Sequence, residues 1–371
     1  MITLLSMIKK IKIIIIESLK ILLASVIVLG MLETYYRFTS DDQNIGLEYT
    51  HPKRNFAYRA NFKGVMAGEA FQLNSLGMRD YEREINFNKD AFRIAIFGDS
   101  LTFGNGVTLK NTFPKILENK LKDDISNEIQ VFNFGVGGYN TTMEYIYLQE
   151  IYENFKPDLV LFVFYTGNDT YSTNSSGTFL NNDYRIFRFI KDQLRSLHVY
   201  GKVGATIISF LRSLNTEQFK EQDAPENFLA YEDTVTEDPV LGYYHPDFPG
   251  WIEAQGTFRK IVDFSKANQF DLAFAITSHV DMEGRLFDAS GNNKNKLILN
   301  KLTEAMEANG VSNILILDDS FEDFIGNEDR ILPKELSYHF SPLAGEIVAE
   351  SLYQFIIDEE FIDIPLFSAP E

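Results

Sequence analysis

The stretch Arg93-Ile-Ala-Ile-Phe-Gly-Asp-Ser-Leu-Thr-Phe-Gly104 decides the fold of this chain. Residues 93–97 are mostly apolar, which predicts a short buried strand. A glycine then ends the strand, and the short polar side chains of Asp99, Ser100 and Thr102 are typical of turns and helix N-caps. Because ligands in open α/β sheets bind beside the carboxyl ends of the strands, we expect the Ser100 hydroxyl to face a crevice at that edge. A serine that only caps the following helix is the alternative.

Beyond this stretch, apolar strands alternate with amphipathic helices. We expect further strands at 129–134, 159–165, 272–277 and 313–317, and helices at 113–121, 142–155, 254–267, 294–309 and 342–357. Strands that are apolar on both faces are typical of a parallel sheet covered by helices on both sides. The sequence therefore predicts a three-layer α/β/α fold with a five-stranded, mostly parallel, flavodoxin-like sheet.

The pattern also predicts how the chain is divided. We expect a cytoplasmic stub with a transmembrane anchor at 1–39, an extended lead-in packed on the main domain at 40–92, the main domain at 93–358, and a tail at 359–371. Residues 170–250 interrupt the alternation and are far longer than an ordinary connection, so we interpret them as an insertion that covers or walls the crevice. In the lead-in, Arg79 is interpreted either as a solvated side chain or as the partner of a carboxylate near the crevice.

The amino-terminal segment bears on location. Residues 13–32 form an apolar window that only Glu17 and Lys20 interrupt, and these two charges are spaced so that they can pair. At about 1.5 Å per residue such a helix spans roughly 30 Å, enough for a hydrocarbon core. Lysines between residues 9 and 12 predict that this end is cytoplasmic and that the main domain is periplasmic or at the cell surface. A cleaved signal peptide and a buried amphipathic helix are the alternatives, and the lack of a small-x-small cleavage pattern favours the anchor.

Composition limits the classes of function. With 371 residues and 45% hydrophobic content, the chain can bury a sizeable core. The net charge of -19 argues against nucleic acid as a partner. The absence of cysteine excludes disulfides, thiolate metal sites and cysteine nucleophiles. Histidine and acidic residues show no metal-ligand spacing, so we expect neither a metal nor another cofactor. Nothing in the sequence points to a particular oligomeric state.

Polar blocks follow successive strands in a recognisable order. They are Gly98-Asp99-Ser100-Leu101, the glycine-rich loop 133–140, Gly167-Asn168-Asp169, and His339 just before the last helix. In this order they resemble the SGNH (GDSL) hydrolase superfamily, over roughly residues 74–358 without the insertion. The segment Asn74-Ser-Leu-Gly-Met-Arg79 and the amino-terminal anchor further resemble a membrane-anchored bacterial subset of it.

The resemblance implies a role for each block. Ser100 would be the nucleophile, and His339 the general base that later acts as the acid toward the leaving group. A serine hydroxyl is a weak nucleophile until a histidine within hydrogen-bond reach takes its proton. The implied oxyanion hole consists of the backbone N–H of Ser100, the backbone N–H of Gly138 and the side-chain amide of Asn168, with Gly137 as the alternative to Gly138.

The sequence departs from the family pattern just before the histidine. The usual acid lies three residues earlier, where this chain has Leu336. We predict a serine–histidine dyad with Glu335 as a helper. An aspartate from the loop 318–329, or a backbone carbonyl, are the other candidates for the group that orients the imidazole. Among the remaining histidines, His279 follows another strand end and is the credible substitute for His339.

The resemblance implies a serine esterase that cleaves small acyl esters through an acyl-serine intermediate. Glycans at the cell surface or on export are the expected carriers of the acyl group, because the main domain is predicted to be extracytoplasmic. One alternative is an O-acyltransferase on the same fold. Another is a binding or assembly protein with weak turnover, which the missing acid favours.

Overall fold

The computed structural model describes residues 47–83, 91–126, 128–170, 239–281 and 284–362, with parts of the segment 16–31. This amino-terminal segment belongs to a separate unit and is helical where it is described. In it, Lys20 Nζ lies 2.8 Å from Glu17 Oε1, as the spacing predicted. No helix in the described part of the chain combines the length and apolar character that crossing a membrane requires. The rest of the predicted anchor, most of the insertion and most of the tail lie outside the described residues.

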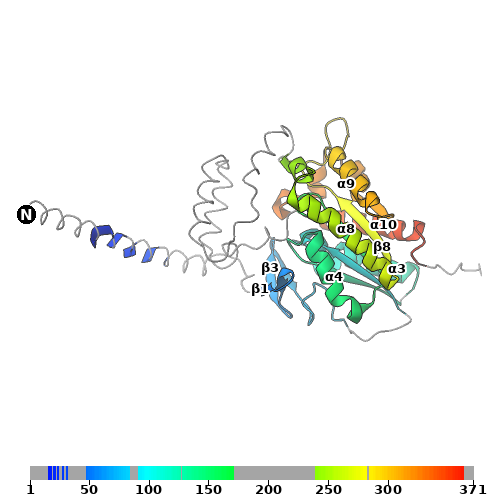
Figure 1. Cartoon of the computed structure of the whole chain (residues 1–371), viewed down its shortest axis with the longest axis horizontal. Coiled ribbons are helices and arrows are strands. Elements are labelled where there is room, and N and C mark those ends of the chain that lie inside the picture. Colours follow the sequence, from blue (N-terminus) through cyan, green and yellow to red (C-terminus); the bar gives the residue numbers. More distant parts are fainter. Residues whose placement is uncertain are drawn as a thin grey trace, which may run out of the picture. The chain divides into compact units, whose positions relative to one another are not determined.

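A five-stranded parallel sheet forms the centre of the main unit (Figure 1). Its strands are β5 (Phe92–Gly98), β6 (Ile129–Gly135), β7 (Leu159–Tyr165), β8 (Asp271–Thr277) and β9 (Ile314–Ile316). They lie in the order β6-β5-β7-β8-β9, and every neighbouring pair is parallel. The predicted flavodoxin-like sheet is confirmed. The strand order reverses at β5, and in such sheets the crevice beside that strand end is the usual place for a ligand.

Helices cover both faces of the sheet. On one face pack α4 (Thr141–Phe155), α8 (Pro249–Asn268) and α9 (Lys296–Ala308), and on the other α3 (Phe113–Asp124) and α10 (Pro342–Asp358). Figure 1 shows α4 and α8 running across the front of the sheet. Shorter helices connect these elements: α2 (Ser100–Phe103), η1 (Leu109–Asn111), η3 (Pro239–Tyr244), η4 (Leu317–Phe324), η5 (Glu328–Arg330) and η6 (Lys334–Leu336). The three-layer α/β/α prediction is confirmed.

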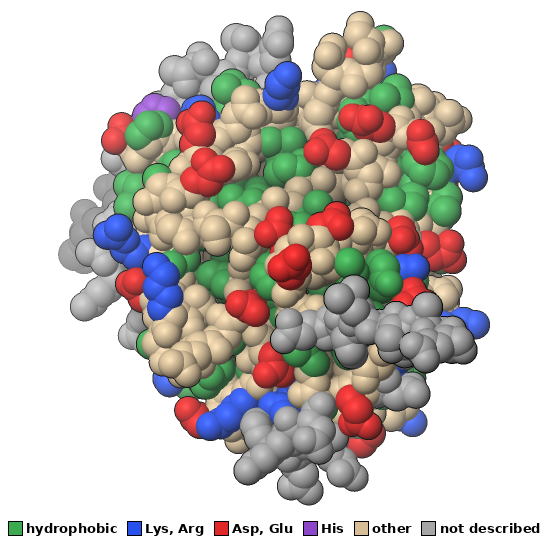
Figure 2. All heavy atoms as spheres, turned by 90° about the vertical axis from the view of Figure 1, so that its right-hand side faces the viewer, with side chains coloured by type: hydrophobic (Ala, Val, Ile, Leu, Met, Phe, Trp, Pro, Cys, Tyr) green, Lys and Arg blue, Asp and Glu red, His purple; other side chains and the backbone are tan. Residues whose placement is uncertain are grey.

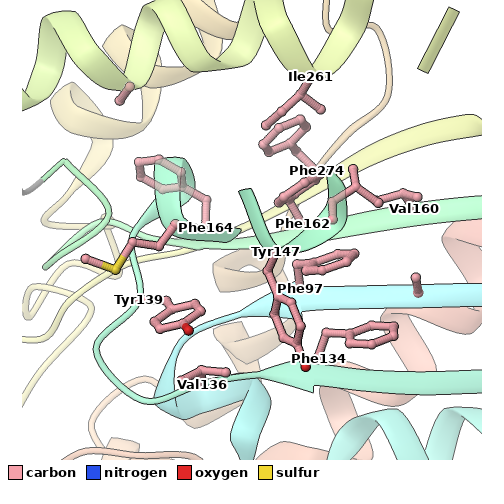
Figure 3. Close-up of a cluster of buried hydrophobic side chains, with 14 of the residues drawn as sticks. Phe97, Phe134, Val136, Tyr139, Tyr147, Val160, Phe162, Phe164, Ile261 and Phe274 are labelled. Carbon is pink, nitrogen blue, oxygen red and sulfur yellow. The ribbon is translucent and has the colours of Figure 1, made fainter. Parts of the chain in front are cut away.

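A row of phenylalanine rings fixes the register of the sheet (Figure 3). Phe134, Phe97, Phe162 and Phe274 are paired residues on neighbouring strands, and their ring centroids are 4.9, 5.3 and 5.2 Å apart in stacked geometry. Tyr147 of α4 packs edge-on against the first two rings. Slipping one strand by a single residue would turn its ring to the opposite face. The residues that follow β5, β6 and β7 are therefore held side by side.

The lead-in forms two antiparallel hairpins rather than an extended stretch. They are β1 (Glu48–His51) with β2 (Asn55–Tyr58), and β3 (Lys63–Met66) with β4 (Glu69–Gln72). The rings of Tyr58 and Phe71 each pack edge-on against Phe103 of α2, with centroids 5.4 Å apart. The hairpins thus share one hydrophobic core with the sheet.

Arg79 is 2% exposed and bonds to backbone carbonyls. Its guanidinium donates to the carbonyl oxygens of Phe103, the last residue of α2, and of Gly104 and Val107 in the turn that follows. Both interpretations made from the sequence, a solvated side chain and a carboxylate partner, are therefore wrong. The reason is that a guanidinium with five donors can satisfy several carbonyls at once and so be buried without a hydrogen bond to a carboxylate.

A buried ionic network ties the end of the lead-in to α3. Lys115 Nζ lies 2.7 Å from Asp80 Oδ1 and 2.8 Å from Glu118 Oε2, and Arg83 Nη2 lies 2.6 Å from the same Glu118 oxygen. Burial raises the pKa of Glu118, but the hydrogen bond from Arg83 and the two positive charges bring it down to about 2. Removing one partner of such a network leaves a buried charge unpaired, at a cost of about 3–5 kcal/mol.

Acidic side chains are spread over the face of the molecule shown in Figure 2. On that face they do not gather into one patch, and the lysine and arginine side chains lie mainly toward its margins. This distribution agrees with the net charge of -19. A surface of this kind keeps a protein soluble and repels polyanions.

Candidate active site

Ser100 and His339, 239 positions apart in sequence, meet at the carboxyl end of the sheet, with Ser100 Oγ 2.7 Å from His339 Nε2. Ser100 is the first residue of α2, directly after β5 and its capping residue Asp99. His339 lies just before α10, whose N-cap Ser341 accepts a hydrogen bond from the Ala344 N–H. The end of β5 and the start of α10 thus bring a hydroxyl and an imidazole within hydrogen-bond reach.

The backbone carbonyl of Leu336 fixes the tautomer of the imidazole. Its oxygen lies 2.8 Å from His339 Nδ1. Because a carbonyl only accepts, Nδ1 carries the proton, and Nε2 of the neutral ring presents its lone pair to the Ser100 hydroxyl. Glu335 is exposed, and no hydrogen bond in the described structure joins it to the ring. Asp318 instead accepts from the Ser278 N–H and the Asn293 amide.

The local backbone explains how this carbonyl reaches the ring. After η6, Ser337 and Tyr338 both adopt left-handed conformations, with φ of 52° and 61°. The chain therefore turns back, and the Leu336 oxygen accepts from both the backbone N–H and the ring of His339. Left-handed residues other than glycine cost about 1–2 kcal/mol each. Backbone strain of this kind gathers at functional sites.

Asp99 and Asn168 form the second half of the constellation. Asp99 Oδ1 accepts from the Leu101 N–H at 2.8 Å, and its Oδ2 accepts from Asn168 Nδ2 at 3.0 Å. Asp99 is 1% exposed, and burial raises its pKa, opposed by the Leu101 N–H, the charge of His339 and the Asn168 amide. The bond to Asp99 uses one amide hydrogen of Asn168 and leaves the second for a ligand at the strand end.

The two candidate donors in the glycine loop after β6, the N–H groups of Gly137 and Gly138, differ in their surroundings. The Gly137 N–H donates to the Tyr58 hydroxyl at 3.0 Å. Gly137 lies beside the nucleophile, since a Cβ built on it would be 3.6 Å from Ser100 Cβ. Gly138 has φ of 80°, which favours glycine, and no described residue accepts its N–H. Of the two glycines, only Gly138 therefore keeps a backbone donor for a ligand.

The buried carboxyl groups of Asp99, Glu144 and Asp169 interact with one another behind this edge. Asp169 Oδ2 accepts from the Tyr165 N–H at 2.5 Å, while Glu144 Oε1 has no partner among the described residues. Burial, together with repulsion from the neighbouring carboxylates, raises the pKa of Glu144 and of Asp169 well above their usual values. Sequence reasoning missed Glu144, because an acidic residue in the first turn of a helix is normally a solvated partner of the helix dipole.

His279, the predicted substitute for His339, lies after β8 at the same edge. Its Nδ1 is 3.0 Å from Thr166 Oγ1, and its backbone N–H donates to the same hydroxyl at 2.8 Å. The imidazole that bonds to Ser100 is that of His339.

Comparison with known proteins gives one family match and several similar solved structures. Residues 96–269 match the model of the GDSL-like lipase/acylhydrolase family. No curated protein matches the sequence. Among solved structures, the chain is similar to the acetyl xylan esterase AlAXEase, with 12% identity, TM-score 0.39, and coverage of 71% of this chain and 98% of that one. It is also similar to the psychrotrophic esterase EstA from Pseudoalteromonas sp., with 15% identity, TM-score 0.40, and coverage of 72% and 97%.

A two-domain esterase active on acetylated mannans is another similar structure, with 12% identity, TM-score 0.40, and coverage of 76% of this chain and 52% of that one. Similarities this low carry no argument about activity. The family match, on a parallel sheet with a serine and a histidine in contact at its edge, supports the SGNH superfamily for this chain and a carboxylic ester hydrolase as its enzyme class.

Proposed function

We propose that Ser100 attacks the acyl carbon of an ester and that His339 moves the proton. Nε2 takes the hydroxyl proton as the Oγ–C bond forms, and then gives it to the leaving alkoxide as the C–O bond breaks. A water molecule repeats the sequence on the acyl-serine and regenerates the hydroxyl. The observation that carries this proposal is the 2.7 Å contact between Ser100 Oγ and His339 Nε2, with the Nδ1 proton held by a carbonyl.

The oxyanion of each tetrahedral intermediate would be held by the N–H groups of Ser100 and Gly138 and by the second amide hydrogen of Asn168. The proposal is supported by the free Gly138 N–H in the described structure and by the orientation that Asp99 gives the Asn168 amide. Donors that are fixed before the reaction cost no reorganisation when the charge develops.

For the substrate we propose small acyl esters on glycans at the cell surface or on export. This part of the proposal follows from the apolar segment and preceding lysines of the amino-terminal sequence, which predict a membrane anchor with the main domain outside the cytoplasm. A carbonyl at Nδ1 carries no full charge, unlike a triad carboxylate. That difference favours slow turnover and keeps the O-acyltransferase and the binding or assembly protein as alternative functions.

Labelling with a serine-reactive phosphonate tests the catalytic proposal. We expect one adduct per chain, on Ser100 by peptide mass spectrometry, and none in Ser100→Ala. An unlabelled folded protein would favour the binding alternative. Product analysis with and without an oligosaccharide acceptor separates hydrolysis from transfer, and protease accessibility of the intact cell's protein tests the location of the main domain.

A further inference from the structure

Asn105 reaches the imidazole from the side of the nucleophile. Its Nδ2 lies 3.3 Å from His339 Nε2, while its Oδ1 is buried and has no partner among the described residues. Because the Nδ1 proton is committed to the Leu336 carbonyl, the Nε2 lone pair faces two donors, the Ser100 hydroxyl and the Asn105 amide. Nothing in the spacing of the sequence blocks singled out this residue.

The position of Asn105 is fixed by the nucleophile's own backbone. The Asn105 N–H and the Gly104 N–H both donate to the Ser100 carbonyl, at 3.1 and 3.0 Å. The buried guanidinium of Arg79 holds the carbonyls of Phe103, Gly104 and Val107 on either side of it. Asn105 and Ser100 are thus parts of one hydrogen-bonded turn, so the backbone that carries the amide is held beside the nucleophile.

Proton transfer changes what the imidazole requires of this neighbour. Nε2 of the neutral ring is a hydrogen-bond acceptor, so the amide N–H of Asn105 can donate to it. Once Nε2 has taken the Ser100 proton it is a donor, and the amide N–H opposes it. A half-turn of the amide about its terminal torsion brings the unpartnered Oδ1 to Nε2, where it accepts. Asparagine and glutamine are the side chains that offer a donor and an acceptor at the same place without a charge.

We propose that Asn105 is a positioning residue for His339, whose amide serves the neutral ring as a donor and the imidazolium as an acceptor. The inference rests on the proposed roles of Ser100 and His339. It assigns to an amide beside Nε2 part of the work that a carboxylate at Nδ1 does in a triad, which is to hold the ring in both protonation states.

Two substitutions and a matched control test the proposal. Asn105→Asp keeps the shape but supplies a fixed negative acceptor, and Asn105→Ala removes both groups. Asn111→Asp adds the same charge in the next turn of the chain, at a residue that forms no hydrogen bond to the imidazole in the described structure. Asp99, a carboxyl group that interacts electrostatically with His339, is unchanged in all three. The measurement is the rate of phosphonate labelling of Ser100 from pH 5 to 9, with unfolding curves to verify the fold of each variant.

We expect Asn105→Asp to move the acid-side midpoint of the rate profile upward by about one pH unit or more, since an opposite charge in contact favours the protonated ring. Asn111→Asp should move it by less than about a third of that. Asn105→Ala should lower the plateau rate about 10-fold, which is less than the roughly 10²–10⁴-fold contribution of a positioned acid–base group, because Asn105 only positions that group. A profile for Asn105→Asp that coincides with that of the wild type, or a plateau for Asn105→Ala at the wild-type rate, would overturn the proposal.

Failure of the proposed function gives a different result, because no form of the protein would then be labelled. In that case the contact between Asn105 and His339 can still be tested by following the proton resonances of the His339 ring as a function of pH. If the ring titrates at the same pH in the wild type and in Asn105→Asp, the amide does not face it and the inference is wrong. A titration that moves upward in the aspartate variant, but not in Asn111→Asp, supports the contact.

Discussion

Replacing Asn168 by alanine removes two interactions with different consequences. The first is the proposed oxyanion donor, and losing one such donor lowers kcat by about 10²–10³, or roughly 2.7–4 kcal/mol. The second is the 3.0 Å hydrogen bond to Asp99 Oδ2, a carboxyl group that is 1% exposed. Hydrogen bonds to charged groups contribute about 1.5–3 kcal/mol. We therefore expect Asn168→Ala to lower the free energy of unfolding by about that amount as well as to slow turnover.

The loss of stability should depend on pH, with a definite sign. Burial raises the pKa of Asp99, and the Asn168 amide is one of the groups that oppose the rise. Without the amide the folded-state pKa moves further up, so the folded state holds its proton to higher pH than the unfolded chain does. Stability then falls as the pH rises from the unfolded value of about 4 through the folded value. The variant should lose more at pH 8 than at pH 5.

The assays are steady-state hydrolysis of p-nitrophenyl acetate and urea unfolding at both pH values. Asn313→Ala is the matched control, because the Asn313 amide donates to the Leu272 carbonyl at 2.9 Å at the amino-terminal edge of the sheet. It should cost about 1 kcal/mol of stability and leave kcat within about twofold of the wild type. If Asn168→Ala keeps kcat within about threefold while stability falls, Asn168 is only structural and our oxyanion argument is wrong.

Other predictions concern groups around the site. Tyr58→Phe leaves the Gly137 N–H without its acceptor, so we expect a loss of about 1–3 kcal/mol in urea unfolding and a fall in kcat at constant KM. Glu144→Gln removes a buried carboxyl group whose pKa is raised by burial and by neighbouring carboxylates. The variant should therefore match the wild type in stability near pH 4 and exceed it increasingly from pH 5 to 8. The control Glu153→Gln, at a side chain that is 77% exposed, should show no such trend. Glu335→Gln should leave kcat within about twofold, because a carbonyl occupies Nδ1; a tenfold fall would show that Glu335 swings to the ring.

Much of the fold was predictable because the sheet is buried on both faces. Strands such as β7 are continuous apolar runs, and helices such as α10 begin with a capping serine followed by proline, so both leave strong local signals. Their ends were predicted to within a few residues. Parallel strands place their carboxyl ends at one edge, which is why the sequence predicts that Ser100, Asn168 and His339 lie together.

The contribution of the lead-in was not predictable. Its strands are only four residues each and lack sustained alternation, so the sequence suggested an extended segment. Tyr58 and Arg79 act on backbone groups, the Gly137 N–H and the carbonyls after α2. Every residue has a backbone, so the sequence does not indicate which backbone groups these two side chains will bond to. These contacts follow from tertiary packing alone.

The orienting group for the imidazole shows the same limit more sharply. A search for side chains three residues before His339 finds Leu336 and concludes that the acid is missing. The structure gives the same residue's carbonyl to Nδ1 instead, through two consecutive left-handed residues, Ser337 and Tyr338. The carbonyl takes the place of the carboxylate because φ is positive at Ser337 and Tyr338. Neither side chain favours a positive φ, so the sequence does not indicate this turn. The carbonyl fixes the ring's direction but brings no full charge. In the described part of the chain, the buried carboxyl group of Asp99 interacts electrostatically with His339 and is a group that can attract the imidazolium when it is ionised.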